Sequence, residues 1–349
     1  MFSPPSVTLD ASLFAIPDIN CREEELVHYI KSLLEWKQLL DAKWLKILMS
    51  QRASSALFEE NLYPSIKILS DLLTHCQTKL FDVQTINTFV NKLLNLTPSF
   101  ETYFHLKDIL YDKIETIPDI LSLMPNKHLQ DDLARLCILI AFLRTYHYKY
   151  ISSHALIFKN APDSTIEVTA QIELIEYSRD DIPDFTSEDL FKGDLIVCTD
   201  FCGFIESIDE SAILINATED EDISLAVRIA LYKDLISRSL TPDWDRELIT
   251  VIGKQFRKTC HKSCCEDKEL SHMVLKSVVK IVKSPKGGKL HRQRKSKSGN
   301  AEVLRRESDD AEARRCWITG ELRLLYWLRL DGKIDLNKVG HHDEIHSHE

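Results

Sequence analysis

The chain has 349 residues, of which 44% are hydrophobic and 28% charged, a composition typical of a globular protein long enough for two domains. It contains 9 glycines, and no glycine-rich phosphate-binding fingerprint is present, which argues against nucleotide-driven motors and dehydrogenases. The formal net charge is −10. The stretch Lys283–Arg306 nevertheless holds nine basic residues against the single acid Glu302, which leaves −18 for the rest of the chain. Such a local excess is typical of a segment that contacts a polyanion.

Targeting and compartment signals are few. No basic segment followed by an apolar core opens the sequence, so no secretory signal is expected. The longest apolar run, Leu133–Leu143, is far shorter than the roughly 20 residues that span a bilayer, and it predicts a buried helix. The 9 cysteines are irregularly spaced, as in proteins of a reducing compartment. We therefore expect a cytoplasmic protein with no membrane partner.

Residues 1–162 are expected to form a helix-rich α/β domain. Strand patterns cover residues 6–10 and 43–50, and amphipathic or apolar helix patterns cover residues 22–36, 51–59, 65–75, 82–96, 106–114 and 128–146. Residues 163–349 are expected to form an α+β domain. It contains an alternating strand at 165–177, a small barrel-like segment of three strands at 192–217, helices at 224–240 and 269–283, and a terminal hairpin with its turn at Asp331-Gly332. The segment 192–217 resembles a small SH3-type barrel.

Four acids of the first domain could act together. Asp10 ends a predicted strand, Glu59 lies near a helix end, and Asp131 and Asp132 lie in the first turn of a long helix. The stretches that carry them are "VTLDASLF", "LKILMSQRASSALFEE" and "DDLARLCILIAF", followed by "YKYISSHALIF". The alternative for the helix acids is a favourable interaction with the helix dipole, and for Asp10 it is a capped turn.

With these stretches, the region resembles the PIN-domain nucleases. The resemblance implies that Asp10, Glu59 and Asp131 or Asp132 are catalytic, and that Asp10, Asp131 and Asp132 hold Mg²⁺ or Mn²⁺. Such a cation prefers carboxylate oxygens and can activate water for attack on a phosphodiester. The sequence departs from the family where a strand usually ends in Ser/Thr-x-Asp, because Ser152-Ser153-His154 stands there instead.

The basic segment and the hairpin after it predict nucleic-acid binding. Basic side chains in a Gly/Ser-rich stretch can neutralise phosphates, and arginines among aromatic residues suit stacking on unpaired bases. The candidate contacts to DNA or RNA are Lys286, Lys289, His291, Arg292, Arg294, Lys295, Lys297, Arg305, Arg306, Arg314, Arg315, Arg323 and Tyr326. The alternative is a solvated loop beside an ordinary hairpin whose core contains Trp317 or Trp327.

Three further patterns are weaker. The stretch "LRLLYWLRLDGKIDLNKVGHHDE" resembles the terminal strands of RelE-type mRNA-cleaving toxins, which implies metal-independent cleavage by a set drawn from His291, Arg292, Arg294, Arg323, Tyr326 and His341. The cluster from Cys260 to His272 matches no standard zinc finger, so reduced thiols are preferred to zinc. The histidine-rich end, "HHDEIHSHE", is interpreted as a polar terminus.

Two functions from different classes follow from these patterns. The first is a nuclease of a toxin-like or phage-defence system, with carboxylates in the first domain and nucleic-acid contacts in the second. The alternative is a non-catalytic nucleic-acid-binding subunit of a larger defence or processing assembly, with other protein subunits as its partners.

Overall fold

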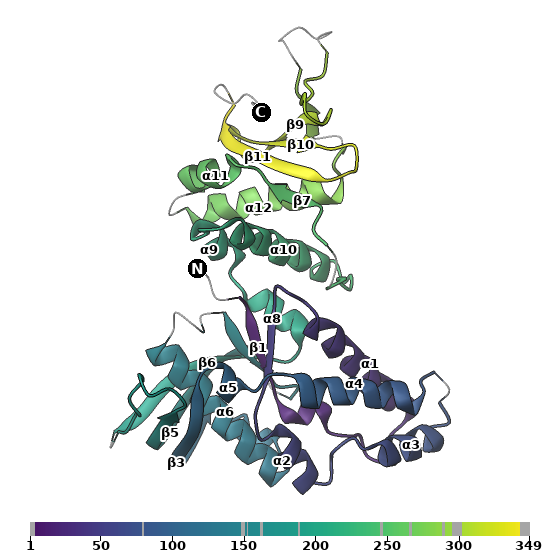
Figure 1. Ribbon diagram of the computed structural model, residues 1–349, viewed down its shortest axis with the longest axis vertical. Coiled ribbons are helices and arrows are strands. Elements are labelled where there is room, and N and C mark those ends of the chain that lie inside the picture. The colour runs from purple at the N-terminus through teal and green to yellow at the C-terminus, as the bar shows by residue number, and fades with distance from the viewer. Residues whose placement is uncertain are drawn as a thin grey trace. The chain divides into compact units, whose positions relative to one another are not determined.

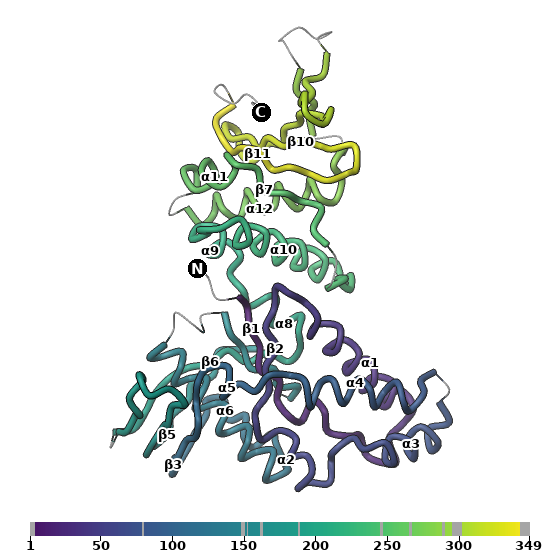
Figure 2. The backbone as a smooth tube through the Cα atoms, viewed as in Figure 1, coloured from purple at the N-terminus to yellow at the C-terminus, as the bar shows by residue number. Residues whose placement is uncertain are grey.

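The computed structural model describes residues 4–78, 80–147, 151, 153–160, 163–187, 189–244, 247–264, 267–287, 290–294 and 302–342. Helices and strands alternate along the chain, as expected for an α/β protein (Figures 1 and 2). Packing divides the chain between Phe204 and Ile205 into an N-terminal unit and a C-terminal unit. This division differs from the expected boundary after residue 162 because two later strands complete the sheet of the N-terminal unit.

The N-terminal unit contains a six-stranded sheet of order β2-β1-β4-β6-β5-β3. Its strands are β1 (Ser6–Leu9), β2 (Lys46–Met49), β3 (Leu106–Ile117), β4 (His154–Ile157), β5 (Ser164–Tyr177) and β6 (Leu190–Cys198). The first four strands in this order are parallel, whereas β5 is antiparallel to both of its neighbours. Buried β-branched and leucine side chains on β1, β4 and β6 give this part of the sheet its apolar core.

Helices surround this sheet. They are η1 (Ala11–Phe14), α1 (Glu23–Leu40), α2 (Ala53–Glu59), α3 (Ile66–His75), α4 (Val83–Leu96), α5 (Phe100–Tyr103), η2 (Leu121–Leu123), α6 (Lys127–Tyr146) and α8 (Phe201–Ser207). Ser65 and Asp82 cap α3 and α4 by accepting hydrogen bonds from Ile68 N and Thr85 N. Every residue from Leu133 to Leu143 on α6 is buried, which confirms the prediction of a buried helix there.

The strand order of the sheet reverses at β1. From β1 the chain crosses to β2 on one side, and it later returns through α6 to β4 on the other side of β1. In parallel sheets of this kind, ligands bind beyond the carboxyl ends of the strands at the point where the order reverses. Asp10 follows the last residue of β1 and therefore lies at this point.

Two sequence-based predictions, one in each expected domain, are wrong. The helix expected at 106–114 is strand β3, whose register against β5 shifts at three places. These irregularities break the two-residue alternation of a strand and produce apolar spacings that mimic a helix. The three strands of the barrel-like segment 192–217 are one strand, β6, followed by the helices α8 and α9 (Glu210–Ile215). Helices begin where turns between these strands were expected, at Cys202-Gly203 and Asp209-Glu210: Asp200 accepts a hydrogen bond from Gly203 N, and Asp209 accepts one from Ala212 N.

The C-terminal unit contains a five-stranded sheet of order β7-β11-β10-β9-β8. Its strands are β7 (Thr250–Ile252), β8 (Leu290–Arg292), β9 (Glu312–Trp317), β10 (Leu322–Leu328) and β11 (Ile334–His341), and its further helices are α10 (Asp220–Ile236), α11 (Phe256–Cys264) and α12 (Lys268–Lys283). Within this unit α11 and α12 lie against the sheet, and α9 and α10 form a layer behind them (Figure 1). The expected β10–β11 hairpin is confirmed, and Gly332 has the positive φ of +84° that its turn requires.

Candidate functional site

Asp10 is a fully buried acid at the carboxyl end of β1. Its Oδ1 accepts hydrogen bonds from the backbone N of Ser12, at 2.9 Å, and from the Ser12 hydroxyl, so that Asp10 caps η1. Its Oδ2 is buried without a hydrogen-bond partner among the described residues. Burial raises the pKa of this carboxyl to about 6, because the charged form loses its hydration. The structure therefore fixes one oxygen of Asp10 and leaves the other buried without a hydrogen-bond partner among the described residues.

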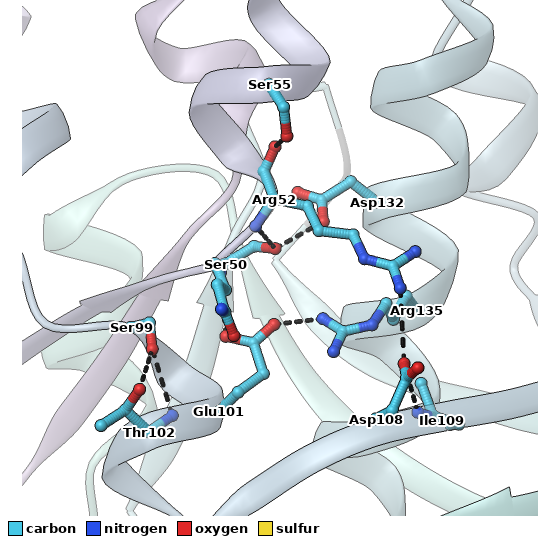
Figure 3. Close-up of polar contacts among 11 residues, drawn as sticks. Ser50, Arg52, Ser55, Ser99, Glu101, Thr102, Asp108, Ile109, Asp132 and Arg135 are labelled. Atoms are coloured by element: carbon cyan, nitrogen blue, oxygen red, sulfur yellow. Dashed lines mark hydrogen bonds and ion pairs between the residues drawn. The ribbon is translucent and has the colours of Figure 1, made fainter.

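Asp132 is the second buried acid, one turn into α6. Its Oδ1 accepts a hydrogen bond of 2.5 Å from Ser50 Oγ, and its Oδ2 has no partner among the described residues (Figure 3). Burial raises the pKa of Asp132 to about 7, and the nearby carboxylates of Asp10 and Glu101 add to this effect. The two carboxyl groups interact electrostatically, because the charge of Asp10 contributes to the raised pKa of Asp132. The site thus contains two carboxyl groups, each with one unpaired oxygen.

Ser50, which directly follows β2, positions Asp132. Its hydroxyl donates to the carboxylate and accepts a hydrogen bond of 3.1 Å from the backbone N of Arg52 (Figure 3). Asp10 and Ser50 follow two adjacent parallel strands, so both lie at the same edge of the sheet. The side chain of Arg52 is 57% exposed and reaches Asp108 at 3.4 Å. A cationic side chain therefore lies at the border of the site.

A buried ion pair lies next to Ser50 and Asp132 and supports the site. Glu101 on α5 has no exposed side-chain surface and bonds Arg135 of α6, whose side chain is 4% exposed (Figure 3). Glu101 also accepts a hydrogen bond of 2.9 Å from the backbone N of Gln51. These contacts tie α5 and α6 to the segment that carries Ser50.

The structure brings together two of the four predicted catalytic acids. Neighbouring residues on a helix point in different directions. Asp131 therefore projects to the surface, where it pairs with Lys127 at 3.3 Å. Glu59 is also exposed, at the end of α2, and pairs with His128 at 2.9 Å. Neither is part of the buried carboxylate site.

His154, which stands where the resemblance implies another acid, lies at the amino end of β4 rather than at the carboxyl edge. Its Nδ1 is 2.7 Å from Ser6 Oγ, and its Nε2 is 3.0 Å from Thr8 Oγ. Burial lowers the pKa of His154 to about 3, so its ring is neutral. It acts as a core residue that links β4 to β1.

Carboxylate oxygens are the donors that hard divalent cations prefer. Among the described residues there is no group of three or more His, Cys, Asp or Glu side chains that could hold a metal. Mg²⁺, however, is usually held by one or two carboxylates, with water and substrate phosphates completing its coordination. The unpaired oxygens of Asp10 and Asp132 provide such a partial set, whereas neither Asp131 nor Glu59 contributes to it.

The raised pKa values predict a pH dependence for the metal-free protein. The folded state keeps the protons of Asp10 and Asp132 to higher pH than the unfolded state, so stability falls as pH rises from about 4 to about 7. Each pKa unit corresponds to ~1.4 kcal/mol. We expect Asp132→Asn to become more stable than the wild type as the pH of EDTA-treated samples rises from 5 to 8, as measured by urea unfolding. A stability difference that is constant across this range would contradict the prediction.

In the C-terminal unit, several predicted nucleic-acid contacts are already bonded within the protein. Arg305 pairs with Asp310 at 2.7 Å, and Arg306 pairs with Asp335 at 2.7 Å. Three other predicted contacts have buried side chains that form hydrogen bonds inside the unit: Arg314, Arg323 and Tyr326. The sequence could not show this, because their partners include backbone carbonyls such as that of Pro285.

The remaining predicted contacts divide into two groups. The exposed members are Lys286, His291, Arg292, Arg294 and Arg315. The members that lie outside the described residues are Lys289, Lys295 and Lys297. The described part of the basic segment thus presents positive charge on and beside β8 and β9.

The cysteine and histidine cluster is spread over two helices. The sulfur atoms of Cys260 and Cys264 on α11 are 3.9 Å apart and buried. His272 lies on α12, where it is exposed and 3.7 Å from Glu210. Cys265 lies outside the described residues.

Comparisons with known proteins identify no relative. No protein-family model, curated protein or solved structure matches the chain. Among the helices of the described residues, none has the length and apolar character needed to cross a membrane.

Sequence reasoning did not identify Ser50, Glu101 or Arg135 as parts of the site. One signal was present, because Arg135 is the only charged residue in the apolar run Leu133–Leu143. A buried arginine requires an acidic partner. The partner, Glu101, lies 34 residues earlier in the sequence, and only the folded structure shows the pairing.

Proposed function

We propose that the N-terminal unit hydrolyses phosphodiester bonds of nucleic acid with Mg²⁺ or Mn²⁺ held by Asp10 and Asp132. The observation that carries this proposal is the pair of buried carboxyl groups, each with an unpaired oxygen, beyond the carboxyl ends of parallel strands where the strand order reverses. Leaving such atoms without a partner costs stability, and sites of this kind often serve a function.

Each residue of the site has a role in this proposal. A divalent cation offsets phosphate charge and lowers the pKa of water, which supplies a nucleophile near neutral pH. Asp10 and Asp132 would hold the cation, and Ser50 fixes the orientation of Asp132. Arg52, whose side chain is more than half exposed and also pairs with Asp108, binds a phosphate of the substrate.

The resemblance to PIN-domain nucleases supports the same proposal through Asp10 at a strand end and Asp132 at a helix start. The resemblance to RelE-type toxins receives less support from the geometry. Tyr326, one of the residues it implies, is buried and donates its hydroxyl to Pro285 O. We therefore propose metal-dependent cleavage rather than metal-independent cleavage by the terminal hairpin, and we keep the toxin-like or phage-defence setting as a proposal.

The second candidate function is a nucleic-acid-binding subunit without turnover. It is favoured by the exposed basic residues on β8 and β9, which do not require a catalytic site. Both functions predict salt-sensitive binding of nucleic acid, but they differ in whether the bound strand is cut.

A cleavage assay of the wild-type protein distinguishes the two functions. Labelled single-stranded and double-stranded DNA and RNA are incubated with the protein in Mn²⁺, in Mg²⁺ and in EDTA. The proposal predicts cleavage of at least one substrate with either cation and none with EDTA. Binding of these substrates without cleavage under any of these conditions would favour the non-catalytic subunit.

A further inference from the structure

The sheet of the C-terminal unit has two different faces. Residues directly opposite each other in antiparallel strands project from the same face, so Cys316, Leu324 and Val339 share one face, and Trp317, Arg323 and Gly340 share the other. The first set is buried on the side of α11 and α12. Figure 1 shows these helices on one side of the β9–β10–β11 layer. We call the other side the open face.

Trp317 is the exposed aromatic residue of the open face. It is 52% exposed, and the guanidinium of Arg323 lies 3.6 Å from the centroid of its ring. Arg323 itself is 4% exposed, and it donates hydrogen bonds of 2.9 Å to Thr319 O and Leu322 O, and one of 3.1 Å to Gly320 O. One face of the indole therefore rests on a fixed cation, and much of the remaining ring surface is open to solvent.

The next row of the open face contains two cationic side chains, Arg315 and Lys338. His291 on β8 is opposite Arg315, which is opposite Leu325, which in turn is opposite Lys338 on β11. His291 and Arg315 are exposed, and no ion pair to Arg315 or Lys338 occurs among the described residues. Burial lowers the pKa of Arg323, and the charge of Arg315 adds to this effect.

The third row of the open face is covered by packing and is not accessible. Trp327 is 3% exposed there and packs with Ala311 and Ala313, while Leu304 packs against this cluster and the Arg306 guanidinium lies 5.4 Å from the Trp327 ring centroid. On this face Trp317, Arg315 and His291 are therefore exposed and Lys338 is partly exposed, whereas the residues of β10 are buried.

We propose that the open face binds single-stranded nucleic acid, with a base stacked on Trp317 and phosphates bound by Arg315, Lys338 and His291. A flat ring stacked on a guanidinium, with its outer surface exposed, suits the π-face of a base, and uncompensated cations suit the phosphates beside it. In a duplex the base faces are covered by their neighbours, so only an unpaired strand can use this ring. This inference rests on the proposed function for its ligand class and specifies the single-stranded form.

Binding in EDTA tests this inference without any cleavage. Fluorescence anisotropy is measured for the full-length protein with short labelled oligo(U), oligo(dT) and a blunt duplex, with Trp317→Ala, Trp317→Phe and the pair Arg315→Gln/Lys338→Gln as variants. Lys276→Gln removes one charge from the exposed side of α12 and is the matched control.

We expect Trp317→Ala to weaken single-strand binding by about 5- to 150-fold, the range for one stacked base, and Trp317→Phe to retain most of it. The paired charge variant should reduce the slope of log affinity against log salt by about 1.4. Wild-type affinity in Trp317→Ala would overturn the proposal. The proposal would also be overturned if Lys276→Gln lost as much binding as Trp317→Ala, or if the duplex bound as tightly as the single strands. Poly-glutamate, an acidic polymer without bases, is measured in the same way, and binding as tight as that of the single strands would overturn the proposal too.

Failure of this inference is distinguishable from failure of the proposed function. Equal affinity in Trp317→Ala, together with metal-dependent cleavage by the wild type, would reject the open face and keep the catalytic site. Loss of binding in Trp317→Ala, with no cleavage by the wild type in any cation, would support the open face and reject the catalytic site.

Discussion

Asp132→Asn is expected to lower the rate of Mn²⁺-dependent nucleic-acid cleavage by roughly 100-fold or more. Changing a partner of a metal ligand typically costs 10- to 100-fold, so removing the ligand's own charge should reach at least the upper end of that range. Asn fits the same space and can accept the hydrogen bond of Ser50, so the loss would reflect the missing charge rather than a change of shape. Asp10→Asn should have the same effect. The measurement is the initial rate of cleavage at saturating Mn²⁺.

Asp131→Asn provides the matched control for this prediction. Asp131 is the adjacent acid on α6, but its side chain is 56% exposed. Among the described residues, its only ion pair is with Lys127. We expect its cleavage rate to stay within about twofold of wild type, since a surface substitution of this kind is usually nearly neutral. A variant series in which Asp131→Asn loses activity and Asp132→Asn keeps it would show that we have assigned the wrong acid.

Arg135→Met is expected to destabilise the protein by about 3–5 kcal/mol, the usual result of removing one partner of a buried ion pair. The variant leaves the Glu101 carboxylate buried without its cation, because neither side chain is more than 4% exposed. The double variant Glu101→Leu/Arg135→Met should recover much of this loss, since no buried charge then remains. Urea unfolding monitored by circular dichroism measures these differences.

An exposed ion pair serves as the control for this second prediction. Lys107 and Glu176 are 3.0 Å apart, with side chains 68% and 31% exposed. Lys107→Met should change stability by no more than about 1 kcal/mol, because surface pairs are weak. If Arg135→Met cost no more than Lys107→Met, the buried pair would not have the supporting role that we assign to it.

The sequence contained enough information to predict part of the candidate site. A short apolar strand ends at Asp10, and a long apolar helix begins near Asp132, so both elements could be predicted from their patterns. The choice between Asp131 and Asp132 could not be made, because α6 is apolar on nearly all sides and its sequence does not show which side of the first turn faces the sheet. Ser50 and Glu101 come from separate segments that only the fold brings to α6.

The nucleic-acid contacts were harder to predict for a related reason. Both faces of β10 are largely buried, so the two-residue alternation that usually separates inward from outward residues is absent. Arg323 and Tyr326 therefore seemed available for ligand binding, although each is bonded to backbone carbonyls inside the unit. Trp317 was one of two tryptophans that could have been buried in the hairpin, and the structure shows that Trp327 is buried and Trp317 is exposed.

The most direct test of the central claim is Mn²⁺ binding to the metal-free wild-type protein at pH 8, where both acids are ionised. Electron paramagnetic resonance of free Mn²⁺ measures the bound fraction in the wild type, in Asp10→Asn and in Asp131→Asn. We predict saturable binding by the wild type and by Asp131→Asn, and loss of that binding in Asp10→Asn. Equal Mn²⁺ binding by all three proteins, or no binding by the wild type, would contradict the assignment of Asp10 and Asp132 as a divalent-cation site.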